Sequence, residues 1–189
     1  MASIITATVA SGLTQSADNS GVLQLASGTG NLVTVPSVTG TVMVSGNMPA
    51  FRATKSSSQT ISNNTLTKVT FDTETFDTAN CFASSTFTPN VAGYYQVNYS
   101  YSAQSLTTGR NYAMSGYIFK NSNIYTTFEH NITSAADQYG NTYVALVYCN
   151  GSTDNIEVYF YQNNSSSGTV LLAGSSTTTQ FSAVLVRGA

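Results

Sequence analysis

Charged side chains are scarce in this 189-residue chain. Only 7% of its residues are Asp, Glu, Lys or Arg, against about 25% in an ordinary soluble domain. The formal net charge is -2, and the six basic residues are scattered along the sequence rather than clustered. Such a chain has no basic patch that would neutralise several phosphates, so we do not expect a nucleic-acid partner. The surface must be covered largely by uncharged Ser, Thr, Asn, Gln and Gly.

Long apolar runs are missing as well. No stretch is long enough and apolar enough to span a bilayer, so the sequence predicts no membrane insertion. A secretory signal peptide needs a basic segment followed by an unbroken apolar segment, and residues 1–8 (MASIITAT) have neither. We therefore expect a product that begins its life in a cytoplasm.

Histidine is represented by a single residue, His130. Any Ser-His-Asp or Cys-His arrangement would have to pass through it. Its neighbours Glu129 and Asn131 lie in an extended or loop segment, where adjacent side chains point to opposite faces. The expected role of His130 is that of a surface or interface residue, and the sequence predicts no catalytic residue and no enzyme.

Cysteine is nearly absent too, since Cys81 and Cys149 are the only two. They allow at most one disulfide bond, and their separation in sequence does not say whether they pair. Cys149 follows the apolar run 143–148 (YVALVY), where a small buried thiol is the expected role. Neither cysteine has the Cys-x-x-Cys or Cys/His spacing of a metal site.

Three acidic residues, Asp72, Glu74 and Asp77, lie within six positions of each other. Their oxygens would suit a hard cation such as calcium. However, this segment lacks the Gly-defined loop of a dedicated calcium site. The sequence therefore predicts no metal site and no cofactor.

The first 48 residues contain no aromatic side chain. Their short apolar runs are separated by Gly, Ser, Asn and Asp, a pattern of strands and turns. These runs are residues 4–5, 22–25, 32–35 and 42–44. Small apolar residues bury too little surface to offset the entropy of ordering the chain. We therefore predict a β-rich arm over residues 1–48 that is ordered by other copies or by a host surface.

Residues 49–189 are rich in Tyr and Phe, which occur in strand-sized runs bounded by Asn, Gly and Ser. This pattern predicts an all-β sandwich with essentially no helix. The pair Asn150-Gly151 is the clearest signal for a tight hairpin. The most informative stretch is 87–95 (FTPNVAGYY), a Pro- and Gly-containing turn that leads into the alternating run 96–102 (QVNYSYS).

The wording F-T-P-x-x-A-G-Y-Y resembles the core signature of the C1q-like domain, the trimeric ten-stranded jelly roll shared with the tumour necrosis factor ligands. Other pieces of the family pattern occur in the same order: 49–53 (PAFRA), 69–72 (VTFD), 116–121 (GYIFKN), 154–160 (DNIEVYF) and 181–186 (FSAVLV). Ser122 and Ala183 stand where the family commonly has Gly, so the turn at Ser122 is expected to be built differently. The residues that carry the resemblance are Phe71, Phe87, Pro89, Gly93, Tyr94, Tyr95, Asn121, Asp154 and Phe181.

This resemblance implies a C1q/TNF-like jelly-roll head over residues 49–189. It also implies a homotrimer in which strands of each sandwich pack apolar and aromatic side chains around a threefold axis. Residues 9–25 (VASGLTQSADNSGVLQL) resemble segments of tail-fibre and other virion proteins of tailed bacteriophages. Together the two resemblances imply a structural protein on the virion surface, anchored to capsid or tail proteins through residues 1–48, with a head that contacts a host surface glycan.

Two alternatives stay open at this point. The protein is either a capsid decoration protein (head fibre) or a tail fibre, and the short chain without a long shaft repeat favours capsid decoration. A different class is a free or secreted C1q-like lectin or recognition module. Such modules usually carry a signal peptide, a collagen-like or coiled-coil stalk and more charge, which this sequence does not show.

Overall fold

The computed structural model describes residues 23–26, 32–35, 46, 48–106, 109–133 and 137–189. The chain divides into two compact units, Met1–Gly40 and Thr41–Ala189. The described residues form strands, turns and bends without an α-helix, which confirms the predicted all-β class. None of them forms a helix that is long and apolar enough to cross a membrane.

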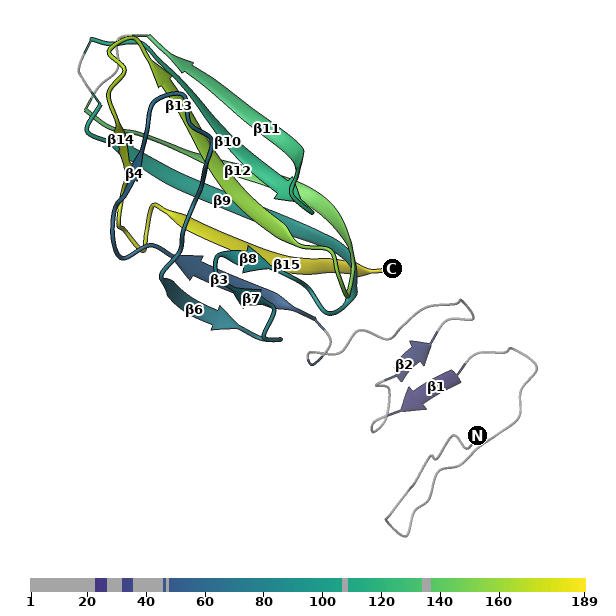
Figure 1. The fold of residues 1–189 in the computed structure, drawn as a ribbon. Coiled ribbons are helices and arrows are strands. Elements are labelled where there is room, and N and C mark those ends of the chain that lie inside the picture. Colours follow the sequence, from purple (N-terminus) through teal and green to yellow (C-terminus); the bar gives the residue numbers. More distant parts are fainter. Residues whose placement is uncertain (1–22, 27–31, 36–45, 47, 107–108, 134–136) are drawn as a thin grey trace. The chain divides into compact units, whose positions relative to one another are not determined.

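The first unit contains one described hairpin-like pair, β1 (Leu23–Ala26) and β2 (Leu32–Val35), in antiparallel register (Figure 1). These strands coincide with two of the four apolar runs that predict strands. The other two runs, 4–5 and 42–44, and most of the phage-like segment lie outside the described residues. The arm boundary at residues 48 and 49 stays a prediction.

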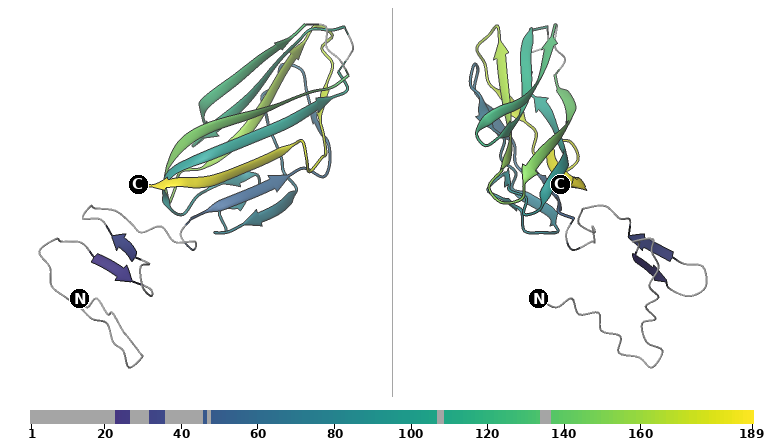
Figure 2. Two further views of the ribbon diagram at one scale, coloured as in Figure 1. Left: turned by 180° about the vertical axis from the view of Figure 1, so that it is seen from behind. Right: turned by 90° about the vertical axis from the view of Figure 1, so that its right-hand side faces the viewer.

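The second unit is a sandwich of two antiparallel sheets (Figures 1 and 2). In the sheet that we call the β9 sheet, the order is β12-β9-β15-β3-β6. At the C-terminal end of β9, β14 pairs with β9, and β4 pairs with β14. Its strands are β3 (Ala50–Thr54), β4 (Gln59–Ile61), β6 (Thr73–Asp77), β9 (Ala92–Gln104), β12 (Tyr139–Asn150), β14 (Val170–Leu172) and β15 (Gln180–Gly188).

The opposite layer, called the β13 sheet, has the order β11-β10-β13-β8-β7, with β5 also paired to β13. Its strands are β5 (Thr67–Lys68), β7 (Phe82–Ala83), β8 (Thr86–Phe87), β10 (Tyr112–Lys120), β11 (Asn123–Ile132) and β13 (Ile156–Asn164). From β9 onward the chain crosses from one sheet to the other at β10, β12, β13 and β14. These crossings place segments that are distant in sequence beside each other.

The core lies between the two sheets and is built by alternation along the long strands. On β9 the odd-numbered residues from Tyr95 to Tyr101 are fully buried, whereas the even-numbered residues face outward. At one end of the core Phe51 stacks on Phe87 with ring centroids 4.6 Å apart and meets Phe181 edge-on at 4.9 Å. The largest fully buried side chains of the head are therefore aromatic.

The prediction of a tight hairpin at Asn150-Gly151 is wrong. The strands on either side, β12 and β13, belong to different sheets and are joined by residues 151–155. The side-chain oxygen of Asn150 accepts hydrogen bonds from the backbone N–H groups of Ser152, Thr153 and Asp154. Gly151 has a φ of +73° and passes so close to the backbone N of Ala92 that a Cβ would lie 2.3 Å from it. The same residue pair therefore starts a crossover between sheets.

The Asn121-Ser122 turn, by contrast, is a two-residue hairpin, since Lys120 pairs with Asn123. Asn121 and Ser122 have φ values of 52° and 62°, the left-handed conformation that this kind of turn requires. Ser122 thus adopts the left-handed backbone conformation that favours Gly.

Candidate functional site

The 87–95 motif builds the entry to β9. Phe87 and Tyr95 are fully buried and meet edge-on with centroids 5.4 Å apart, and Pro89 is buried beside the entry. The hydroxyl of Tyr95 donates a 2.7 Å hydrogen bond to the carbonyl of Val91, which closes the turn. A Cβ on Gly93 would lie 2.3 Å from the carbonyl oxygen of Arg187, so β15 approaches here as only Gly allows.

The remaining signature residues also lie in structural positions. Phe71 and Phe181 are buried together with centroids 5.7 Å apart. Asn121 and Asp154 contact each other through a 2.7 Å hydrogen bond, although they belong to different loops. Most of the motif residues therefore hold the fold, and Tyr94 is the one among them with a large exposed side chain, 42% accessible.

Tyr94 lies on the outer face of the β9 sheet. Its cross-strand neighbour on β12 is Tyr148, and the two rings have centroids 5.4 Å apart. The next outward row places Leu146 and Val184 on either side of Gln96. We define the apolar patch as the exposed large hydrophobic residues of β9, β12 and β15: Tyr94, Val144, Leu146, Tyr148, Val184 and Val186.

Charge is confined to the margin of the apolar patch. Arg187 is the register partner of Tyr94 on β15. Lys120 Nζ lies 5.5 Å from the ring centroid of Tyr148 and forms a 2.9 Å ion pair with Asp154. Clustered exposed apolar side chains with a polar rim are typical of protein–protein interfaces.

The side of the sandwich next to the patch is closed by contacts between β11 and β12. The hydroxyl of Tyr125 donates a 2.8 Å hydrogen bond to the carbonyl of Leu146. Phe128 stacks on Tyr143 at 4.5 Å, and His130 stacks on Tyr139 at 4.6 Å. His130 thus has a packing contact with the aromatic ring of Tyr139.

The acidic residues near β6 serve the local backbone. Asp72 accepts hydrogen bonds from the N–H groups of Ser56 and Ser57 at 2.6 and 3.2 Å. Asp77 accepts from the N–H groups of Ala79 and Phe82 at 3.1 and 2.7 Å. Within the described ranges no three His, Cys, Asp or Glu side chains are grouped so that they would hold a metal ion.

Cys81 and Cys149 are both free and buried. Burial raises the pKa of both thiols, for Cys149 to about 11. A thiol held in its neutral form is a poor nucleophile, so these residues act as small core side chains.

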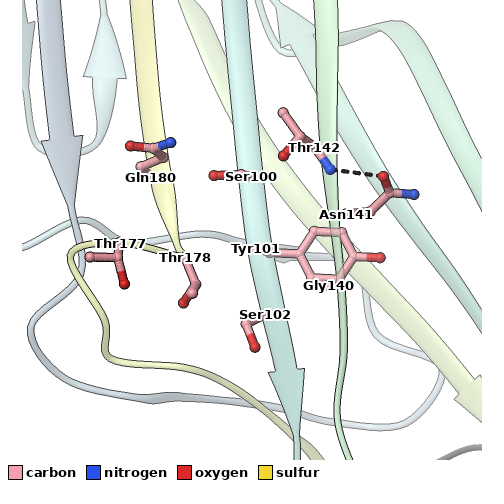
Figure 3. A pocket seen from close by; sticks show the side chains of 9 residues that line it. All are labelled: Ser100, Tyr101, Ser102, Gly140, Asn141, Thr142, Thr177, Thr178 and Gln180. Carbon is pink, nitrogen blue, oxygen red and sulfur yellow. Dashed lines mark hydrogen bonds between the residues drawn. The ribbon is translucent and has the colours of Figure 1, made fainter.

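A hollow lies on the outer face of the β9 sheet, on the same sheet surface as the apolar patch but toward the other end of β9 (Figure 3). It has a volume of about 520 Å³. Gln180, Ser100 and Thr142 form one row across β15, β9 and β12. The lining consists of Ser100, Tyr101, Ser102, Gly140, Asn141, Thr142, Thr177, Thr178 and Gln180. No local sequence pattern marks this hydroxyl-lined hollow, because Ser and Thr are spread through the whole chain.

The two sheets are arranged as in a jelly roll, and several solved structures have a similar fold. Murine APRIL matches with a TM-score of 0.53 at 11% identity, over 74% of this chain and 99% of that structure. The globular domain of zebrafish complement 1qA matches with a TM-score of 0.53 at 16% identity, over 75% and 98%. Eiger TNF from S. frugiperda matches with a TM-score of 0.51 at 11% identity, over 75% and 93%.

The head therefore has the C1q/TNF-like jelly-roll fold, as the sequence motifs predict. No protein-family model matches the chain. No curated protein matches it either. The structural likeness at 11 to 16% identity defines the fold and leaves the function to be argued from the surface of the molecule.

Proposed function

We propose that this chain is a structural protein of a bacteriophage virion, displayed on the particle surface as a homotrimer. In this proposal residues 1–48 anchor the protein to other virion proteins, and the head contacts a host surface glycan. The chain acts by binding and has no catalytic role. In this proposal the protein is either a capsid decoration protein (head fibre) or a tail fibre.

The single observation that carries the homotrimer is the apolar patch. It consists of residues on three adjacent strands, β9, β12 and β15, whose exposed fractions lie between 39 and 58%. Burying apolar surface stabilises association by roughly 25 cal/mol per Å². Tyr94 and Tyr148 suit an interface because each combines a large apolar ring with a polar hydroxyl. A second and third copy of the same head would cover the apolar patch.

Two further features support placement on a virion. The phage-like segment 9–25 belongs to the unit that is separate from the head. The head carries few charges, which limits charge-dependent adhesion to cell debris and leaves hydrogen-bonding surface for sugars.

The test begins with the oligomeric state of the full chain and of a truncated chain that starts at Met48, measured by light scattering after size-exclusion chromatography. Each is then mixed with capsids and with tails of the phage that encodes it, prepared without the protein. We expect the full chain and the truncated chain both to form trimers. Only the full chain should bind, and it should bind one of the two kinds of particle. The particle that is bound distinguishes capsid decoration from a tail role.

Two results would contradict the proposal. A full chain that is monomeric by light scattering would contradict the proposed homotrimer. Equal binding of the full and truncated chains to the particles would remove the anchoring role of residues 1–48. Either result would favour a free recognition module with the same fold.

A further inference from the structure

We propose that the hydroxyl-lined hollow is a binding site for a neutral saccharide. This inference rests on the proposed function, because it gives a position and a chemistry to the contact between the head and a glycan. The hollow lies on strands β9, β12 and β15 and on the turn that precedes β15. Its volume of about 520 Å³ falls within the roughly 300–1,000 Å³ of small-molecule sites.

The hollow exists because its floor consists of very short side chains. Ser100 and Ser102 face outward from β9, and Gly140 of β12 is the cross-strand partner of Ser102. A Cβ on Gly140 would lie 2.9 Å from the carbonyl oxygen of Tyr101, so this part of the floor stays bare. Thr177 and Thr178, from the turn before β15, line it on the other side.

Ser100 is the observation that points to a ligand. Ser100 is only 6% exposed, and its Oγ has no hydrogen-bond partner among the described residues. A buried hydroxyl without a partner destabilises the protein by about 1–3 kcal/mol relative to a satisfied one. In Figure 3 this hydroxyl lies between Gln180 and Thr142 on the lined face of the sheet. A ligand in the hollow would supply the missing partner.

Gln180 is oriented as a hydrogen-bond donor toward the hollow. Its Oε1 accepts a 2.8 Å hydrogen bond from Nε of Arg52. Because a guanidinium only donates, the oxygen must face Arg52, and the amide nitrogen lies on the side of Ser100, as Figure 3 shows. Arg52 also donates to the carbonyl of Ser176 at 2.9 Å, which holds the turn beside the hollow in place.

The lining selects for uncharged, hydroxyl-rich ligands. None of the nine lining residues is charged. The three guanidinium nitrogens of the nearby Arg52 already donate to Gln180, Thr75 and Ser176, so they are not directed at an anion in the hollow. An apolar ligand would leave the lining hydroxyls unpaired, at a cost for each. A saccharide offers alternating donors and acceptors that match Ser, Thr and Gln side chains.

The test uses the full chain and saturation-transfer NMR with four neutral probes: glucose, galactose, mannose and N-acetylglucosamine. Glucosamine and N-acetylneuraminic acid serve as charged comparators. We expect at least one neutral sugar to bind more tightly than both charged ones. Ser100→Ala should weaken that binding about 3- to 10-fold, the effect of one hydrogen bond. Thr142→Tyr, which fills the hollow from an exposed position, should weaken it more than about 10-fold.

Ser115→Ala is the matched control, since Ser115 is 7% exposed and faces outward on the opposite sheet. It should leave binding unchanged. The inference is overturned if no neutral sugar binds, or if the Ser100 and Thr142 variants bind as the wild type does. It is also overturned if these two variants change the oligomeric mass, because a second copy would then occupy the hollow. A trimer that binds virion particles but no sugar would leave the proposed structural function standing.

Discussion

The side-chain amide of Asn121 donates a 2.7 Å hydrogen bond to Asp154 Oδ1, across a sequence separation of 33 residues. The other carboxylate oxygen of Asp154 accepts from the backbone N–H of Asn150 and from Lys120 Nζ, both at 2.9 Å. This carboxylate therefore ties the β10–β11 turn to the crossover between the two sheets. Two residues that the family resemblance singles out thus act as one structural unit.

Replacing Asp154 should lower stability in a pH-dependent way. Hydrogen bonds from Asn121 and Lys120 hold the pKa of Asp154 below its ordinary value of 3.8. The carboxylate therefore contributes stability above pH 3.8 and loses it as the pH falls through the lowered folded-state pKa. Asp154→Asn should reduce the free energy of unfolding by about 1–3 kcal/mol at pH 7, with a smaller difference below pH 3.8. Urea unfolding from pH 2 to 7 measures this. Exposed Glu74→Gln is the control, and a pH-independent difference would contradict the prediction.

Ser122→Gly should stabilise the head. Ser122 has a φ of 62°, which is unfavourable for a residue with a side chain and free of cost for Gly. The expected gain in the free energy of unfolding is about 0.5–1 kcal/mol, measured by urea unfolding. Ser182→Gly, within strand β15, should instead destabilise the protein. A loss of stability in Ser122→Gly would show that this turn is under no strain.

Gly93→Ala should destabilise the head by about 1–3 kcal/mol, because the new methyl group would meet the backbone of β15. Gly168→Ala is the matched control. The atom nearest to its added Cβ is 3.8 Å away, so its effect should stay within about 0.5 kcal/mol. Thermal or urea unfolding of both variants decides the point, and equal effects would argue against the close approach at Gly93.

Leu146→Glu should convert the proposed trimer to a monomer, because it places a carboxylate in the middle of the apolar patch. Leu66→Glu is the matched control, since Leu66 is 42% exposed but lies outside the patch. Light scattering after size-exclusion chromatography should give the mass of one chain for Leu146→Glu and of three for the control. If Leu146→Glu kept the mass of the wild type, the patch would not be the interface.

Both cysteines should be present as free thiols. Without reductant, two thiols per chain should react with a thiol reagent in urea. In the native protein Cys149 should react slowly, since a pKa of about 11 leaves only about 0.1% thiolate at pH 8. Fewer than two reactive thiols in urea would indicate a disulfide bond.

The local pattern of the sequence predicts much of the fold. The alternating run 96–102 belongs to β9, and the alternation places Val97, Tyr99 and Tyr101 in the core. The apolar run 32–35 coincides with β2. These features follow from residues that are neighbours in sequence, because the two-residue repeat of a strand is a local property. The order of the family motifs adds the jelly-roll topology.

Features that depend on strand pairing could not be predicted in this way. Asn150-Gly151 has the local chemistry of a hairpin, yet it starts a crossover because β12 pairs with β9 and β13 pairs with β10. Similarly, nothing in the sequence places Tyr148 beside Tyr94.

The row of Gln180, Ser100 and Thr142 shows the same limit at the candidate sugar site. The sequence by itself determines the all-β class, the aromatic core and most strand positions through periodicity and turn chemistry. The tertiary structure alone decides the apolar patch and the hydroxyl-lined hollow, because both are assembled from strands that pair only after the chain has crossed between the two sheets.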